Sequence, residues 1–157
     1  MKKALFAGSF DPFTKGHYEV VKAILPLFDE VTIAIAVNNS KKYLFTLQQR
    51  IDWIKAAFAY NPAIKVDSYD GLTLDYCKMN NITYLVRGIR TSTDFEYEKS
   101  IAQANQAISQ ELQTIFVPCS PDTAFISSTI IRELLVNNGN IQAFLPPNVT
   151  INQQDIR

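Results

Sequence analysis

The strongest strand signal in the sequence is the run Val31-Thr32-Ile33-Ala34-Ile35-Ala36-Val37. This run is almost continuously β-branched or small and apolar, and it lacks the alternation of a strand that faces water on one side. Such runs are typical of strands covered on both faces in a parallel sheet. The run therefore predicts a strand inside a parallel sheet.

Strand-like and helix-like segments alternate along the rest of the chain. Further strands are expected at 4–7, 64–69, 83–86 and 114–117, and helices at 17–28, 46–59 with a capping box at Thr46, 72–79, 95–109 and 128–136. This alternation predicts an α/β fold, a doubly wound five-stranded parallel sheet with helices on both faces (Rossmann-like). The tail after Pro146-Pro147 is polar and is expected to fray.

Length, charge and cysteine content narrow the class of protein. The 157 residues are 47% hydrophobic, which predicts a single domain over 1–157. Fifteen Lys plus Arg balance fifteen Asp plus Glu, so no global field favours nucleic acid or an anionic membrane. Cys77 and Cys119 have no partner at ligand spacing, so we expect two small buried hydrophobes rather than a disulfide or zinc site. No apolar run approaches the ~20 residues of a membrane span, and we expect a cytoplasmic protein.

The segments that follow the strands carry side chains suited to phosphate. They run from Ser9 to His17, from Asn38 to Lys42, from Arg87 to Arg90 and from Ser120 to Thr129. In doubly wound folds these loops share the ligand-binding edge of the sheet. They bring together imidazole, ammonium, guanidinium and hydroxyl donors, which predicts a polyphosphate substrate.

Two motifs lie at strand-to-helix junctions. In Thr14-x-Gly16-His17 the glycine lets the backbone approach a ligand, and the histidine opens a helix whose positive end favours anions. In Ile126-Ser127-Ser128-Thr129-Ile130-Ile131-Arg132 three hydroxyls cap a helix and can donate to phosphate oxygens. The first loop has neither a dinucleotide fingerprint nor a Walker sequence, which disfavours a dehydrogenase or kinase. Together the motifs resemble T/H-x-G-H and I-S-S-T-x-I-R of the nucleotidyltransferase superfamily.

The resemblance narrows at three further places. They are Gly8-Ser9-Phe10-Asp11-Pro12, Lys41-Lys42, and Arg87-Gly88-Ile89-Arg90 followed by Asp94-Phe95-Glu96-Tyr97-Glu98. This combination is similar to the bacterial phosphopantetheine adenylyltransferases, over nearly the whole chain from Leu5 to Pro146. Ser9 stands where many members carry Thr, and the tail after Val149 differs from their usual charged helix.

The resemblance implies transfer of the adenylyl group of ATP to 4'-phosphopantetheine in coenzyme A biosynthesis, giving dephospho-CoA and pyrophosphate. His17 and Lys41 would be catalytic, and Ser9, Lys41, Thr73 and Arg87 would bind phosphopantetheine. ATP would be bound by Ser9, Phe10, His17, Gly88, Ile89, Arg90, Glu98, Thr123, Ala124, Phe125, Ile126, Ser127, Ser128 and Thr129. Magnesium (Mg2+) would bridge the phosphates without a protein cage, and members are commonly homo-hexamers.

Other interpretations stay open at this point. In an interpretation without a binding site, the Lys41-Lys42 pair would be solvated, and Arg87 and Arg90 would pair with Asp94 and Glu98 on the surface. The hydroxyl cluster from Ser127 to Thr129 would then be an N-cap only. The aromatic rings, including that of Phe10, are expected in the core rather than stacked on a base. Within the superfamily, a nicotinamide mononucleotide adenylyltransferase or a cytidylyltransferase is the alternative, and outside it a nucleotide-binding module without turnover.

Overall fold

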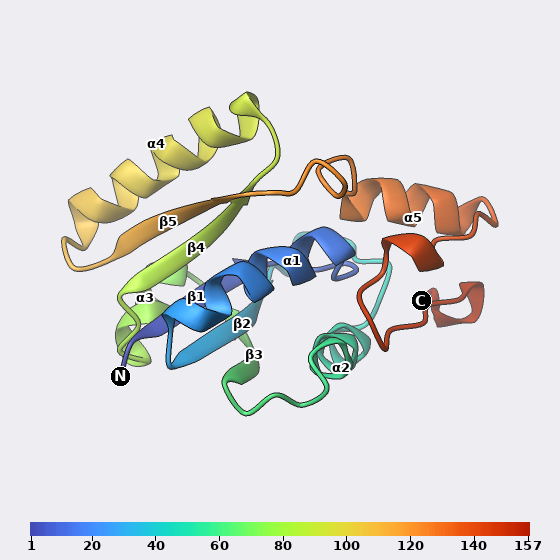
Figure 1. Cartoon of the computed structure of the whole chain (residues 1–157), viewed down its shortest axis with the longest axis horizontal. Helices are drawn as coiled ribbons and strands as arrows, with labels where there is room; N and C mark the ends of the chain where they lie inside the picture. Colours follow the sequence, from blue (N-terminus) through green and yellow to red (C-terminus); the bar gives the residue numbers. More distant parts are fainter.

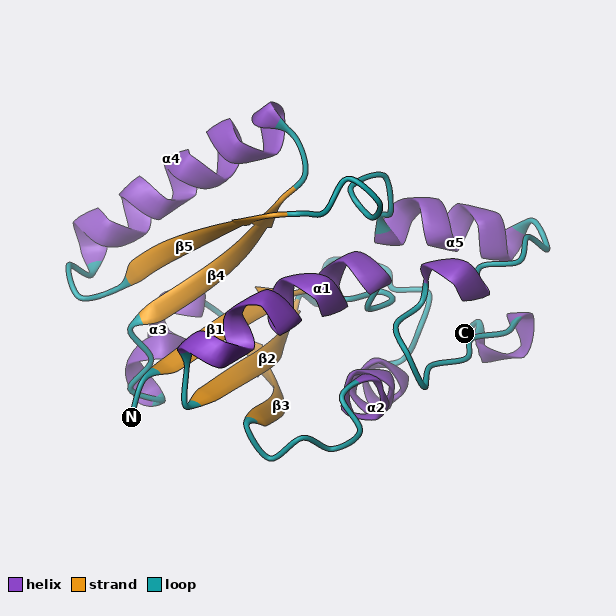
Figure 2. Ribbon diagram, viewed as in Figure 1, coloured by secondary structure: helices purple, strands orange, loops and turns teal.

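The computed structural model describes all 157 residues and contains one parallel sheet flanked by helices (Figures 1 and 2). The strands are β1 (Lys3–Gly8), β2 (Glu30–Val37), β3 (Ile64–Asp70), β4 (Tyr84–Ile89) and β5 (Gln113–Pro118), and the helices are α1 (Lys15–Ile24), α2 (Leu47–Ala57), α3 (Thr73–Met79), α4 (Ser92–Ile108) and α5 (Ser128–Val136). Short 3-10 turns lie at Leu25–Leu27, Gln142–Phe144 and Gln153–Asp155. The strand order is β3-β2-β1-β4-β5, with every neighbouring pair parallel. The predicted doubly wound α/β fold is confirmed.

The strand that predicted the fold is buried on both faces. Ile33 of β2 packs in one cluster with Val21 of α1 and Ile54 of α2. Ala34, the next residue, points to the opposite face, where it shares a second cluster with Cys77 of α3. Fully burying a Val or Ile side chain contributes about 1.5–3 kcal/mol. A run without polar alternation therefore fits a strand covered by helices on both sides.

Capping residues decide where the helices begin. The capping box predicted at Thr46 is confirmed, because its hydroxyl accepts from the Gln49 N–H at 3.2 Å and the Gln49 side chain accepts from the Thr46 N–H. Two other helices begin earlier than predicted: Thr14 caps α1, and Thr91 caps α4 by accepting from the Asp94 N–H at 3.1 Å. α1 also ends before the predicted residue 28, since Pro26 cannot continue an α-helix.

β4 is longer than the sequence indicates, which corrects the expected loop from Arg87 to Arg90. The strand continues to Ile89, and its last three residues pair with Phe116, Val117 and Pro118 of β5. Arg87 and Gly88 therefore lie on a hydrogen-bonded ladder and not in a loop. Their positions are held by the sheet, which makes them firmer points of attachment for a ligand than loop residues would be.

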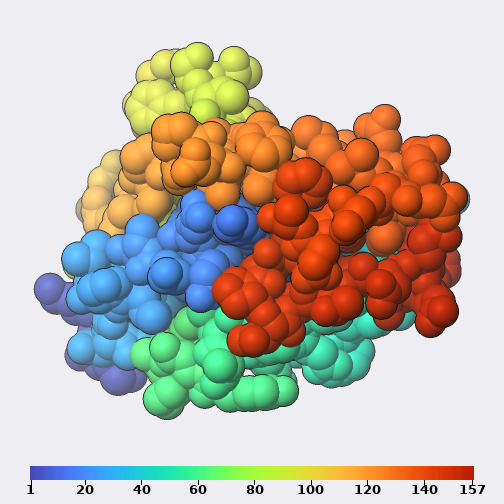
Figure 3. Space-filling model, turned by 45° about the vertical axis from the view of Figure 1, so that its right-hand side comes forward, coloured from blue at the N-terminus to red at the C-terminus, as the bar shows by residue number.

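The tail predicted to fray packs against the rest of the chain, and that prediction is wrong. Val149 and Ile151 are buried in a cluster with Phe45 and Leu135, and the Arg157 N–H donates to the Leu44 carbonyl at 3.0 Å. Figure 3 shows this red segment lying beside the teal part of the chain that contains α2. The few apolar side chains of a polar segment are enough to dock it when a matching surface is present.

No helix in the chain combines the length and the apolar composition that crossing a membrane requires.

Candidate active site

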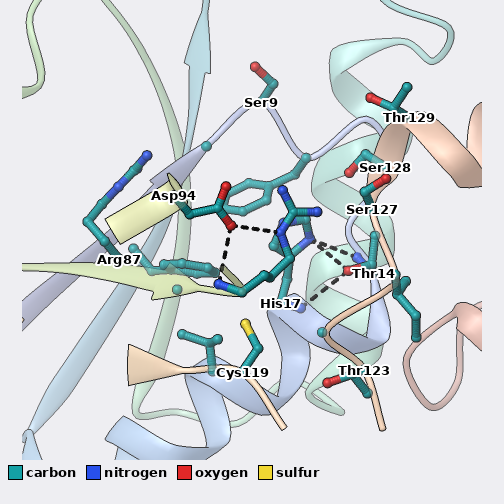
Figure 4. Close-up of a pocket in the computed structure, with 18 of the residues that line it drawn as sticks. Ser9, Thr14, His17, Arg87, Asp94, Cys119, Thr123, Ser127, Ser128 and Thr129 are labelled. Atoms are coloured by element: carbon teal, nitrogen blue, oxygen red, sulfur yellow. Dashed lines mark hydrogen bonds and ion pairs between the residues drawn. The ribbon is translucent and has the colours of Figure 1, made fainter. Parts of the chain in front are cut away.

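One pocket, called the main pocket below, opens beyond the carboxyl ends of β1 and β4, where the strand order reverses (Figure 4). Its volume is about 600 Å³. The β1–α1 loop, the end of β4, the first turns of α4 and the β5–α5 loop contribute its walls. Of the predicted site residues it brings together Ser9, Phe10, His17, Arg87, Gly88, Arg90, Glu98, Thr123, Ile126, Ser127, Ser128 and Thr129.

Five predicted site residues lie outside this pocket: Lys41, Thr73, Ile89, Ala124 and Phe125. Lys41 follows β2 and lines a neighbouring hollow of about 490 Å³, which it shares with Ser9. Thr73 follows β3 at the edge of the sheet, and its hydroxyl lies 2.8 Å from the Tyr69 hydroxyl. Phe125 is 60% exposed. Lys41 and Thr73 lie apart from the pocket because the strands ahead of them, β2 and β3, lie beyond β1 in the sheet. The binding roles of these five residues stay predictions.

His17 faces the pocket in a defined orientation. The ring nitrogen Nδ1 of His17 accepts from the Thr14 backbone N–H at 3.0 Å, and the backbone N–H of His17 donates to the Thr14 hydroxyl at 3.3 Å. A ring nitrogen that accepts from a backbone N–H carries no proton, so the proton of the neutral ring is on Nε2. Burial, together with the nearby cations of Arg90 and Arg87, lowers the pKa of His17 from 6.5 to about 4, and burial is the largest of these causes. His17 is therefore a neutral donor through Nε2 at physiological pH.

The two arginines of the pocket each pair with a carboxylate of α4. Arg87 Nε donates to Glu98 Oε2 at 2.7 Å, Arg87 Nη2 donates to the other oxygen of that carboxylate, and Nη1 donates to the Ala7 carbonyl at 2.9 Å. Arg90 Nε donates to Asp94 Oδ2 at 3.3 Å. The predicted pairing is confirmed. Both oxygens of Glu98, predicted to contact the nucleotide, are used in holding Arg87.

The hydroxyl cluster at the start of α5 is used differently by each of its members. The Ser127 hydroxyl is the N-cap and accepts from the Ile130 N–H at 3.2 Å, while Ser128 Oγ donates to the Pro12 carbonyl at 2.8 Å. Thr129 Oγ1 accepts from Arg132 Nη2 at 3.2 Å. The first N–H groups of a helix have no acceptor within the helix, so those of Ser128 and Thr129 are available to an anion at the pocket.

Comparison with known proteins identifies the family. Residues 5–134 match the family described as cytidylyltransferase-like. The chain is 45% identical over 151 residues to the phosphopantetheine adenylyltransferase of Flavobacterium psychrophilum, covering 96% of this chain and 99% of that protein. The enzyme of the same name from Bacteroides thetaiotaomicron is 44% identical over 152 residues, covering 97% and 100%. The chain belongs to the phosphopantetheine adenylyltransferase family.

A solved structure agrees with this assignment at the level of the fold. A bifunctional NMN adenylyltransferase/ADP ribose pyrophosphatase from Francisella tularensis superposes with a TM-score of 0.73 at 18% sequence identity. The match covers 94% of this chain and 46% of that one, so the chain spans just under half of the bifunctional protein. The resemblance stated from the motifs is confirmed, and as a phosphopantetheine adenylyltransferase family member the protein is a nucleotidyltransferase rather than a binding module without turnover.

The family member also has site residues that sequence reasoning missed. Asp11 is 4% exposed, and its carboxylate accepts from the N–H groups of Leu44 and Phe45 at 2.9 and 3.0 Å. Arg132 Nη1 donates to the Asp11 carbonyl at 2.6 Å. Both line the pocket. Both residues lie inside motifs that carry the family resemblance, but nothing in their sequence spacing shows what their side chains contact.

Two residues of the pocket, Cys119 and Thr123, differ from the sequence-based expectation, the first in its burial and the second in the partner of its side chain. Cys119 was expected to be fully buried like Cys77, but it is half-buried and lines the pocket. Thr123 is buried, and its hydroxyl donates to Glu19 Oε2 at 2.8 Å. This bond fastens the β5–α5 loop to α1, and it engages the hydroxyl of a residue that is predicted to bind ATP.

Proposed function

We propose that this protein transfers the adenylyl group of ATP to the phosphate of 4'-phosphopantetheine, giving dephospho-CoA and pyrophosphate, a step of coenzyme A biosynthesis. The observation that carries the proposal is that His17, Arg90 and the N-terminus of α5 line one pocket at the reversal of strand order. Relatives that are 44–45% identical, and that match over 99–100% of their length, are named phosphopantetheine adenylyltransferase.

The reaction forms a bond between an oxygen of the acceptor phosphate and the α-phosphorus of ATP, and it breaks the bond from that phosphorus to the bridging oxygen of the β-phosphate. The nucleophile is already an anion, so no general base is required. Negative charge grows on the α-phosphate oxygens and on the departing pyrophosphate, and catalysis depends on positioning and charge stabilisation. The Nε2 proton of His17 supplies a neutral hydrogen-bond donor for an α-phosphate oxygen.

The remaining donors divide between the two substrates. Arg90 and the free N–H groups of Ser128 and Thr129 would hold the β- and γ-phosphates. Arg87 uses three of its N–H groups on Glu98 and Ala7, which leaves two of the five of a guanidinium for the acceptor phosphate. Ser9 lies between the pocket and the hollow that contains Lys41, so that lysine would reach the transferring group from the far side of Ser9.

The proposal includes magnesium held by the phosphates. The carboxylates that line the pocket, those of Asp11, Asp94 and Glu98, all accept from an arginine or from backbone N–H groups, and the chain has no cluster of three metal-ligating side chains. This donor set suits an ion that takes its oxygens from the nucleotide. When bound, it would supply charge neutralisation on the triphosphate.

The proposal extends to a cytoplasmic location and to assembly as a homo-hexamer. Exposed apolar side chains along α4, among them Tyr97 and Ile108, support contact with further subunits. Sedimentation velocity on the purified full chain would give the mass of the assembly, and a monomer at micromolar concentration would contradict this part of the proposal.

The test of the activity is pyrophosphate release in a panel of ATP or CTP against 4'-phosphopantetheine or nicotinamide mononucleotide. We expect turnover only with ATP plus phosphopantetheine. His17→Asn should fold normally and turn over about 100- to 1000-fold more slowly, the usual effect of losing one preorganised donor. Turnover of nicotinamide mononucleotide at a comparable rate would reject the assigned acceptor, and undiminished turnover by the variant would remove His17 from the mechanism.

A further inference from the structure

A second hollow, of about 540 Å³, adjoins the first and shares Lys41 with it. Its lining combines the end of β2, the N-terminal half of α2 and the last residue of the chain. Four of its side chains are cationic: Lys41, Lys42, Arg50 and Arg157. No Asp or Glu lines it, and none of the six ion pairs in the chain involves any of these four side chains.

Arg50 distinguishes this hollow from a patch of solvated lysines. It is 2% exposed, and its guanidinium lies over the Tyr43 ring at 4.2 Å from the ring centre. Nη1 donates to the Ser9 carbonyl at 2.7 Å, and Nε donates to the Thr46 carbonyl at 3.4 Å. Nη2 donates to no acceptor. Since every fully buried side-chain polar atom in the chain has a partner, Nη2 retains access to open space, and the hollow is where Arg50 lines open space.

The charge of Arg50 is incompletely balanced. Its pKa is lowered first by burial, and the nearby cation of Arg157 lowers it further, while Asp11 and Tyr43 act in the opposite direction. The carboxylate of Asp11 already accepts two backbone N–H groups and lies 3.9 Å from Arg132 Nη1. A buried cation is costly unless it is paired and hydrogen-bonded. An anion in the hollow would supply the missing acceptor for Nη2 and relieve the repulsion between the two arginines.

We propose that this hollow binds a phosphate group, either as the free inorganic anion or as the monoester of a small metabolite, separately from the triphosphate pocket. The guanidinium edge of Arg50 would form the floor, in the planar geometry that suits phosphate oxygens. Lys42 and Arg157 would approach from the rim. Because Nη1 of Arg50 holds the Ser9 carbonyl, the site is attached directly to the first loop of the active pocket.

Isothermal titration calorimetry at low ionic strength tests the proposal on the full chain saturated with α,β-methylene-ATP, which keeps the triphosphate pocket filled. Inorganic phosphate and glycerol 2-phosphate are the two probes. We expect two binding events per chain for inorganic phosphate, one at the open acceptor subsite of Ser9, Lys41 and Arg87 and one at the hollow, and binding of the second probe tells whether an esterified phosphate is also admitted. No binding of either probe to the wild-type protein would overturn the proposal.

The variant Lys42→Gln/Arg157→Gln removes two cations from the rim without touching Arg50 or Lys41. It should weaken one of the two phosphate-binding events at least tenfold and leave the other unchanged. The matched control, Lys55→Gln/Lys78→Gln, removes the same charge from exposed positions that do not line the hollow and should bind within twofold of wild type. If phosphate binding weakened equally in both variants, the net charge of the protein would account for the effect, and the proposed site would be rejected. The turnover of both variants should match wild type, and a wild-type chain without turnover would refute the adenylyltransferase proposal while leaving this binding result standing.

Discussion

His17 is the single histidine of the chain, and the structure predicts that it stays neutral well into the acid range. The Thr14 N–H fixes Nδ1 as an acceptor, and three phenylalanine rings lie 5.1–6.0 Å from the imidazole centre. Burial among them disfavours the charged ring, and Arg90 and Arg87 add like-charge repulsion. A proton on Nδ1 would also break the bond to Thr14.

The magnitude follows from the displaced pKa. The pKa is lowered from 6.5 to about 4 in the folded protein, so the unfolded chain binds a proton that the folded chain does not. The neutral ring therefore contributes stability that is fully present above pH 6.5 and is lost as the pH falls from 6.5 towards 4. Lowering a pKa by one unit corresponds to about 1.4 kcal/mol, so the whole change corresponds to about 3 kcal/mol in the free energy of unfolding. About 2 kcal/mol of this stability is lost between pH 7.5 and pH 5.

Proton NMR of the ring Cε1–H measures this directly, since one histidine gives one signal. The apo protein should show no change in that signal between about pH 8 and pH 5.5, whereas the urea-unfolded chain should titrate near the ordinary histidine value. Arg90→Gln should raise the folded pKa but leave it below 6.5, because burial is the largest cause. Urea unfolding of His17→Gln should lack the loss of about 2 kcal/mol seen for wild type over the same range. A folded-state midpoint at pH 6 or above would refute the reasoning.

Three further predictions concern the contacts around the pocket and the tail. Asp11→Asn keeps the size of the side chain but loses the charged group that accepts the Leu44 and Phe45 N–H groups. We expect the free energy of unfolding in urea to fall by about 1–3 kcal/mol and the KM for the acceptor to rise. Wild-type values of both quantities would show that the segment from Lys41 to Phe45 does not depend on Asp11. Glu98→Gln removes the ionised anchor of Arg87 and should raise the KM for phosphopantetheine about tenfold while kcat changes less, whereas Glu96→Gln, on the exposed pair with Lys99, should leave both kinetic constants unchanged. Ile151→Ala deletes a buried side chain of the tail and should cost about 2–4 kcal/mol, against less than about 0.5 kcal/mol for Val136→Ala, a residue that is 54% exposed; equal effects would mean that the tail is not part of the folded core.

The parts of this protein that the sequence predicted are those controlled by neighbours along the chain. The unbroken apolar run from Val31 to Val37 predicted a doubly covered strand, and the Thr46–Gln49 spacing predicted a helix start, since strand burial patterns and capping depend on residues a few positions apart. The two motifs likewise predicted phosphate-binding turns, and both lie at the main pocket.

Other features depended on contacts between distant segments. The sheet order β3-β2-β1-β4-β5 places the loop after β2 beside the main pocket rather than inside it, so Lys41 is separated from His17 by Ser9. The same packing gives Asp11 its partners in Leu44, Phe45 and Arg132 and leaves one edge of Arg50 without an acceptor. None of these relations has a local signature, because the residues involved are up to 121 positions apart.

The sequence by itself determined the fold class, the family resemblance and the kinds of donor at the site, because each is written in short-range spacing and side-chain chemistry. The tertiary structure decided which donors share a pocket, which are already engaged by a carboxylate or carbonyl, and how the polar tail packs. The physical reason is that burial and hydrogen-bond satisfaction are properties of the assembled fold: a side chain becomes free, paired or buried only when segments from different parts of the chain come together around it.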